Sequence, residues 1–145
     1  MVPASSYKFL PHTTDAYVEA TGATFEQALE NAGMALFDTM CEIDSIWPIM
    51  TDAIEFEGED EVTLLYDWLE SLLLKFELER KVYSKLRVGE ITKSSNLLRG
   101  TARLSGETYD RARHKSKVEV KGVTYHKMEI THDKDSTTIR YILDL

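Results

Sequence analysis

Three oxygen-bearing groups near the two ends of the chain are of the right chemical type to hold a cation. Asp15 lies in a predicted turn between two short strands, and Asp144 and Leu145 close the sequence. The Asp144 side chain and the carboxylate that ends the chain at Leu145 repel each other unless a cation or basic group lies between them. An oxygen-only set of this kind suits calcium or magnesium. On spacing alone, an Asx-turn at Asp15 and a solvated chain end are the favoured interpretation.

A row of cations in the second half of the chain is the other candidate for binding chemistry. If residues 111–121 are extended, five basic side chains line one face, while Val118 and Val120 point to the other. Such a row can bind phosphate or an acidic protein surface. A solvated outer face is the simpler interpretation for most of these residues. The five are Arg111, Arg113, Lys115, Lys117 and Lys121.

Catalytic motifs are absent from the sequence. It contains no P-loop, no dinucleotide-binding glycine pattern, no nucleophile elbow and no HExxH motif. His126 and His132 are spaced to share a strand face, but a strand histidine is more often simply hydrogen-bonded than a metal ligand. The single Cys41 excludes a disulfide framework and a multi-cysteine zinc cluster, and it fits a reducing compartment.

Length and composition predict one globular domain over residues 1–145. The chain is 43% hydrophobic and 29% charged, which is ordinary for a folded domain of this size. The longest apolar run, residues 72–74, is far too short to span a bilayer, and no secretory signal is visible. We therefore expect a soluble, cytoplasmic protein without membrane contact.

Charge is distributed unevenly along the chain. The net charge is −8, yet residues 1–72 hold one lysine against 15 acidic residues, and residues 73–145 hold 16 basic against 10 acidic residues. Net acidity argues against a general nucleic-acid coat. A local basic surface in the second half is still able to meet an acidic partner, unless the two halves simply cover each other's charge within one fold.

Two amphipathic helices are predicted from apolar spacing. Thr24 is a helix N-cap with Gln27 three residues later, and apolar residues follow at helical spacing over about 25–43. A second helix over about 61–79 carries a Trp and Leu stripe that is wider than a surface helix requires. This second helix is expected to be central to the core.

The remaining segments alternate with period two and predict strands. Short turns join most of them, so the fold class is α+β, with two helices packed against a mainly antiparallel or mixed sheet of about seven strands. Pro48 places part of one segment at an edge or in a connection, and residues 106–110 are expected to be a loop. The predicted strands cover 7–10, 16–20, 46–57, 83–88, 97–104, 118–130 with a break at Gly122, and 137–143.

Several segments, taken in order, together resemble the archease family. His12-Thr13-Thr14-Asp15 is similar to its H-T-A-D turn, with Thr14 in place of Ala. The run VKGVTYH at 120–126 is similar to its K-A-x-T-Y-H strand, with Gly122 in place of the more common Ala. The acidic ending at 142–145 also matches. Further similar segments are ALFDTM at 35–40, LLYDWL at 64–69, Gly106-Glu107, Tyr109-Asp110 and Arg113-His114.

This resemblance implies a non-enzymatic partner of an RtcB-type RNA ligase in tRNA splicing. Archease-like proteins promote guanylylation of the ligase histidine and allow multiple turnover. The family carries a divalent cation, assigned as calcium and held by carboxylates. Its ligands correspond to Asp15, Asp144 and Leu145, and Lys121 matches a family lysine considered important for function. Magnesium is the alternative ion, and whether tRNA is contacted directly stays open.

Two other functions compete with this expectation. One is a chaperone or interaction module for other tRNA-processing enzymes, such as a tRNA methyltransferase. The other is a metal-dependent phosphoesterase with Asp15 and Asp144 as ligands and His12 or His126 as base, although a second cluster of ligands is missing from the sequence. The sequence leaves the oligomeric state and the docking surface on the ligase undetermined.

Overall fold

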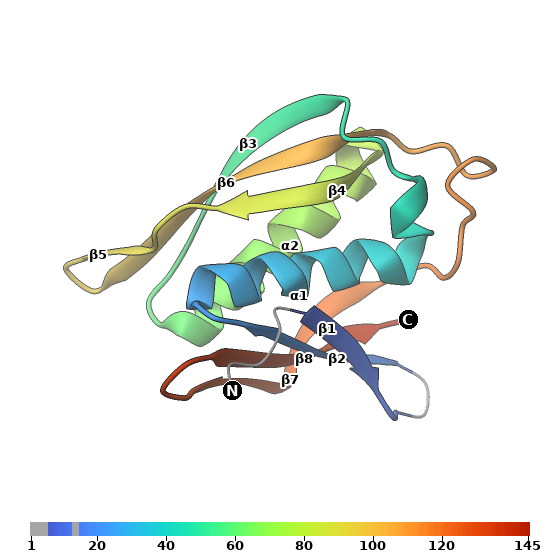
Figure 1. The fold of residues 1–145 in the computed structure, drawn as a ribbon. Coiled ribbons are helices and arrows are strands. Elements are labelled where there is room, and N and C mark those ends of the chain that lie inside the picture. Colours follow the sequence, from blue (N-terminus) through green and yellow to red (C-terminus); the bar gives the residue numbers. More distant parts are fainter. Residues whose placement is uncertain (1–5, 13–14) are drawn as a thin grey trace.

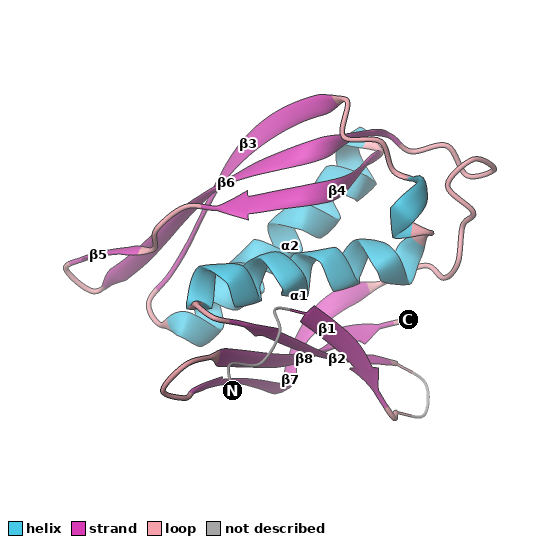
Figure 2. Cartoon of the chain, viewed as in Figure 1, coloured by secondary structure: helices cyan, strands magenta, loops and turns pink. Residues whose placement is uncertain are grey.

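Two helices lie between two antiparallel β-sheets in a computed structural model that describes residues 6–12 and 15–145 (Figures 1 and 2). Helix α1 spans Phe25–Met40 and helix α2 spans Glu61–Glu79. Each helix contacts strands of both sheets. The α+β prediction with two helices is confirmed, but the strands number eight and form two sheets, not one.

The first sheet joins the two ends of the chain. Its strand order is β1-β2-β8-β7, and all neighbours are antiparallel. Strand β8 is therefore central, and it pairs with β2 and β7 at once. The strands are β1 (Ser6–Leu10), β2 (Ala16–Gly22), β7 (Gly122–His132) and β8 (Thr137–Asp144).

The second sheet covers the opposite side of the helices. Its order is β3-β6-β4, and the short β5 also pairs with β6. The long strand β6 is the centre of this sheet and is antiparallel to each of its partners. The strands are β3 (Met50–Gly58), β4 (Lys81–Val88), β5 (Thr92–Ser94) and β6 (Leu97–Thr108).

The core lies in the helix layer between the sheets. Trp68 of α2 is fully buried, and its Nε1 donates to the Leu29 carbonyl of α1 at 2.8 Å. Tyr141 of β8 is also fully buried, and its hydroxyl donates to the Ala32 carbonyl at 2.6 Å. Because the helices are covered on two sides, they need apolar residues around most of their circumference, which explains the wide stripe on α2.

Side-chain caps begin both helices. The Thr24 hydroxyl accepts from the Gln27 N–H at 3.1 Å, as predicted, although the Gln27 side chain returns to the Ala23 N–H instead of that of Thr24. At α2, Asp60 and Thr63 form a complete capping box. Helix α1 ends at Met40, earlier than the predicted 43, and a short 3₁₀ helix, η1 (Ile43–Ser45), follows.

The prediction of a loop at 106–110 was wrong over its first half. Strand β6 continues to Thr108, and Gly106 pairs with both Met50 and Tyr83. A Cβ atom at Gly106 would lie 1.9 Å from the Val82 carbonyl oxygen. The glycine therefore permits a close approach of β4 to β6 rather than marking a turn.

Two other strand predictions also need correction at their ends. Strand β3 begins at Met50, after Pro48, and residues 118–121 lie outside β7. Proline has no N–H to donate to a ladder, which agrees with the later start of β3. Strand β7 itself is irregular, because its register on β8 shifts between Thr124 and Glu129.

Candidate functional site

The register of the first sheet brings the early aspartate to the end of the chain. Strand β2 pairs with β8 from Gly22↔Thr137 to Ala16↔Leu143. One further step in the same register places Asp15 opposite Asp144. Figure 1 shows the start of β2 and the end of β8 at the same end of this sheet. Residues directly opposite on antiparallel strands have Cα atoms about 4.5–5.5 Å apart.

The last residues are held by the fold. Asp144 is part of β8, and its carbonyl oxygen accepts from the Lys121 N–H at 2.7 Å. Leu145 is half-buried and packs against the hydrophobic core. The side chains of Asp144 and Lys121 are exposed. The register and the Lys121–Asp144 bond thus place Asp15, Asp144, Leu145 and Lys121 at one end of the first sheet, and cation binding there stays a prediction.

Polar and aromatic groups surround this end of the sheet. His12 Nδ1 lies 3.7 Å from the Asp15 carboxylate, and this buried atom has no hydrogen-bond partner among the described residues. The His12 ring contacts Tyr17 edge-on, and the Lys127 Nζ lies 5.6 Å from the centre of the Tyr17 ring. The site is therefore partly enclosed and still has an unsatisfied polar atom, which suits a polar or ionic ligand.

The donor chemistry fits a hard divalent cation. The set offers two side-chain carboxylates and a terminal carboxylate, and calcium and magnesium prefer oxygen ligands. No cluster of three His, Cys, Asp or Glu side chains able to hold a metal occurs in residues 6–12 and 15–145. Asp15 and Asp144 are therefore not part of such a three-residue cluster, and the cation site stays a prediction.

The basic row of residues 111–121 does not form a strand face. Residues 111–115 form turns, and Lys115 has a φ of 55°. The Lys117 Nζ lies 3.1 Å from the Asp38 carboxylate, and Arg113 forms an ion pair with Glu107. Val118 is exposed while Val120 is buried, so the predicted common face does not exist. Among the described strands, none pairs with residues 111–121, so nothing holds this segment in the extended form that alternation requires.

The two strand histidines do not act together. His132 Nδ1 contacts the Thr137 hydroxyl at 3.0 Å, and its Nε2 contacts Glu61 at 2.7 Å. His126 lies inside the irregular part of β7, where Lys127 has a φ of 56°. Hydrogen bonding therefore accounts for His132, in agreement with the simpler interpretation.

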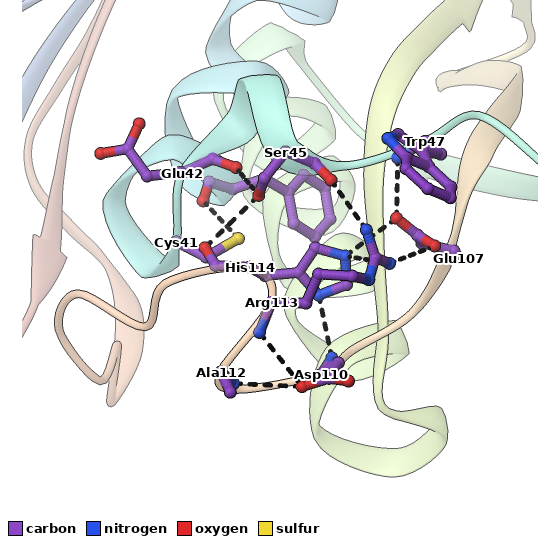
Figure 3. Close-up of polar contacts among 10 residues, drawn as sticks. Cys41, Glu42, Ser45, Trp47, Glu107, Asp110, Ala112, Arg113 and His114 are labelled. Atoms are coloured by element: carbon purple, nitrogen blue, oxygen red, sulfur yellow. Dashed lines mark hydrogen bonds and ion pairs between the residues drawn. The ribbon is translucent and has the colours of Figure 1, made fainter.

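A second polar cluster, around Glu107 and His114, was not predicted as a site (Figure 3). His114 is fully buried, and its Nε2 lies 2.9 Å from Glu107. Its Nδ1 accepts from the Asp110 N–H at 2.9 Å, so Nε2 carries the hydrogen and donates to Glu107. Glu107 also accepts from the Trp47 N–H at 2.7 Å and pairs with Arg113.

These contacts give the Glu107 cluster a structural role. Burial by itself would raise the pKa of Glu107, but bonds from Arg113, His114 and the Trp47 N–H outweigh burial and lower the pKa to about 2. The Arg113 guanidinium also lies 4.8 Å from the centre of the Trp47 ring. The cluster ties the 110–114 turn to the segment before β3. The motif pieces Gly106-Glu107 and Arg113-His114 were its only sequence signal.

The model of the Archease protein family (MTH1598/TM1083) matches residues 7–145. The chain therefore belongs to the archease family. The archease of Methanopyrus kandleri is 38% identical over 137 residues, which are 94% of this chain and 96% of that protein. In the part of the chain that the structure describes, no helix is long and apolar enough to cross a membrane.

Solved structures show the same fold. The solution structure of protein 1598 of Methanobacterium thermoautotrophicum matches with a TM-score of 0.83 and 31% identity, over 98% of this chain and all of that one. A crystal structure from Thermotoga maritima, described as an archease and possible chaperone, matches with a TM-score of 0.60 and 19% identity, over 95% of this chain and 96% of that one.

Proposed function

We propose that this protein activates an RtcB-type RNA ligase of tRNA splicing by promoting guanylylation of the ligase. Membership of the archease family supports this role. The acidic groups at the end of the first sheet are of the chemical type that could bind the cation it requires. The observation that carries the proposal is the β2–β8 register, which sets Asp15 opposite Asp144 beside the chain end. The protein acts by placing charge, and it forms no covalent intermediate of its own.

Each residue of the site has a distinct task in this proposal. Asp15, Asp144 and the carboxylate of Leu145 hold a divalent cation, with calcium as the first candidate and magnesium as the second. When bound, the cation supplies positive charge for phosphate oxygens. Lys121 is exposed, and its backbone N–H donates to the Asp144 carbonyl. The backbone that carries its ammonium group therefore adjoins the proposed cation site. It neutralises phosphate charge in the ligase complex.

Carboxylate variants test this proposal. Guanylylation of a cognate ligase is measured with labelled GTP in the presence of the unchanged protein, Asp15→Asn, Asp144→Asn or a chain lacking Leu145. We expect each change to reduce stimulation at least about tenfold, because removing one charge from the set weakens cation binding. Lys121→Gln should also reduce stimulation, with cation binding retained.

The matched control is Asp135→Asn, in the turn at the far end of β7 and β8. It removes the same charge without touching the site, and it should stimulate like the unchanged protein. Full stimulation by all three carboxylate variants, each with a folded circular dichroism spectrum, would remove the site from the mechanism.

A chaperone or interaction module for other tRNA-processing enzymes is the second candidate. It is favoured by exposed apolar side chains before and at the start of β3, because Trp47 is 59% and Ile49 66% exposed, and Met50 is also exposed. Such a patch is typical of a protein-contact surface. This function differs from the first because protection of a partner from aggregation would survive Asp144→Asn.

A further inference from the structure

The outer face of the second sheet carries a compact group of cations. This face points away from both helices (Figure 1). Side chains at alternate positions of β4 and β6 are exposed on it, and the register between the strands shows which of them are neighbours. We define the basic face by three of these residues, Lys85, Arg87 and Arg103.

Two arginines stand directly opposite each other on this face. Arg87 of β4 pairs with Arg103 of β6, and Lys85 lies in the next outward row, opposite Ser105. Opposite residues on neighbouring antiparallel strands have Cβ atoms about 4.5–5.5 Å apart, and like charges in that position destabilise the pair. An adjacent acidic residue would relieve this repulsion.

No acidic residue neutralises the basic face in the part of the chain that the structure describes. None of its three cations has a carboxylate within 4.0 Å, whereas many other lysines and arginines do. On the outward positions of β3, Glu55 lies opposite Thr101 and Glu57 lies opposite Arg99, and Arg99 already lies 4.0 Å from Glu57. The repulsion is therefore left for an external anion to relieve.

The residues around the cations have small side chains. A shallow depression of about 400 Å³ is lined by the two arginines, and Ala53, Gly89 and Thr101 contribute to its lining. In the rows on either side, Thr51, Ser105 and Thr101 carry hydroxyl groups. Small side chains allow a backbone to approach closely, and hydroxyl groups donate to phosphate oxygens together with arginine and lysine.

We propose that the basic face binds the phosphate backbone of an RNA helix. A protein partner would need an aromatic or large apolar anchor at the centre of its contact, and no apolar residue that lines this depression is larger than Val88. A single strand with splayed bases would need aromatic platforms, and the outward positions named above hold none. Cations and hydroxyls without stacking groups are typical of backbone recognition of a helix.

This contact goes beyond the proposed ligase activation and uses different residues. The basic face belongs to the second sheet, whereas Asp15, Asp144 and Lys121 belong to or adjoin the first. Its failure would leave the cation site untouched. The acidic strand β3 at one edge restricts the path of the RNA backbone over this face, because Glu55 and Glu57 repel a phosphate chain that crosses over them.

Fluorescence anisotropy with a labelled RNA hairpin tests the proposal on the full chain. We expect binding at low salt, with log Kd depending on log salt by about 0.9 for each phosphate contacted. The double variant Arg87→Gln/Arg103→Gln should weaken binding about tenfold or more and make the salt slope shallower by about 2. The control Arg111→Gln/Lys134→Gln removes the same charge elsewhere and should bind like the unchanged protein.

Three outcomes would overturn the proposal. One is the absence of hairpin binding at low salt. Another is an equal loss in both double variants, which would show an unspecific charge effect. The third is tighter binding of an unstructured single strand of the same length than of the hairpin. Guanylylation stimulation by Arg87→Gln/Arg103→Gln, measured without tRNA, should be unchanged, so the two proposals fail separately.

Discussion

At the residue scale, the best-defined interactions lie outside the proposed cation site. Glu107 receives bonds from three donors, and its partner His114 is completely buried. Because the donors stabilise the charged form, the pKa of Glu107 falls from 4.5 to about 2. A carboxyl group with a lowered pKa in the folded protein stabilises the fold above its unfolded pKa, and this contribution is lost as pH falls toward the folded value.

This gives a pH prediction for Glu107→Gln. The substitution keeps the shape but removes the charge, so it should lower the free energy of unfolding by about 2 kcal/mol at pH 7. The difference from the unchanged protein should shrink as the pH falls from about 4.5 towards about 2. Urea denaturation at several pH values measures both effects.

The control for this substitution is Glu90→Gln, at an exposed position. It removes the same charge from the surface and should change stability by no more than about 0.5 kcal/mol. A constant deficit of Glu107→Gln down to pH 2 would mean that the charge of Glu107 does not explain the loss of stability.

At the element scale, two glycines of the sheets differ in the space that a Cβ atom would have. A Cβ at Gly106 would collide with the Val82 carbonyl, because β4 and β6 meet closely there. At Gly122, the first residue of β7, nothing lies within 4 Å of the same added atom. The close approach of the strands at Gly106 is thus a property of the sheet, whereas Gly122 contributes only conformational freedom to the unfolded chain.

Alanine substitution at the two positions should therefore have opposite signs. Gly122→Ala should raise the free energy of unfolding by about 0.5 kcal/mol, because the unfolded chain loses freedom. Gly106→Ala should lower it by about 3 kcal/mol or more, since the backbone must shift to avoid the carbonyl. Thermal and urea unfolding of the pair measure the difference, and equal effects of the two substitutions would contradict the close contact at Gly106.

At the scale of the whole molecule, the fold and the proposed cation site are separable. The core lies between the helices and the sheets, and it is complete without the exposed Asp144 side chain. Continued one step past Ala16↔Leu143, the register places Asp15 opposite Asp144, where two carboxylates would repel each other without a cation. Loss of the cation should therefore loosen one end of a sheet without unfolding the protein.

Calcium should accordingly raise the melting temperature of a folded apo protein. At a hundredfold excess over Kd the gain is about 2.7 kcal/mol, which corresponds to roughly 5–10 °C for a domain of this size. Asp144→Asn should abolish this shift and melt slightly higher than the unchanged protein without calcium. A shift that persists in Asp144→Asn, but not in Asp135→Asn, would place the cation elsewhere.

Sequence patterns predicted those parts of the protein that depend on near neighbours in the chain. Helical spacing and the Thr24 cap located both helices, and alternation located most strands, because these signals act over a few residues. The family motifs also indicated Asp15, Asp144 and Lys121 as site residues. The extended row at 111–121 failed because alternation alone cannot supply a partner strand.

Only the tertiary structure decided how distant segments meet. Pairing of β2 with β8 runs to Ala16↔Leu143, one step before Asp15 and Asp144, and pairing of β4 with β6 sets Arg87 opposite Arg103. The sequence likewise did not predict that the strands divide into two sheets around the helices. A strand's own residues determine that it is a strand, but its partner and register depend on the burial of the whole core at once, and no local pattern contains that information.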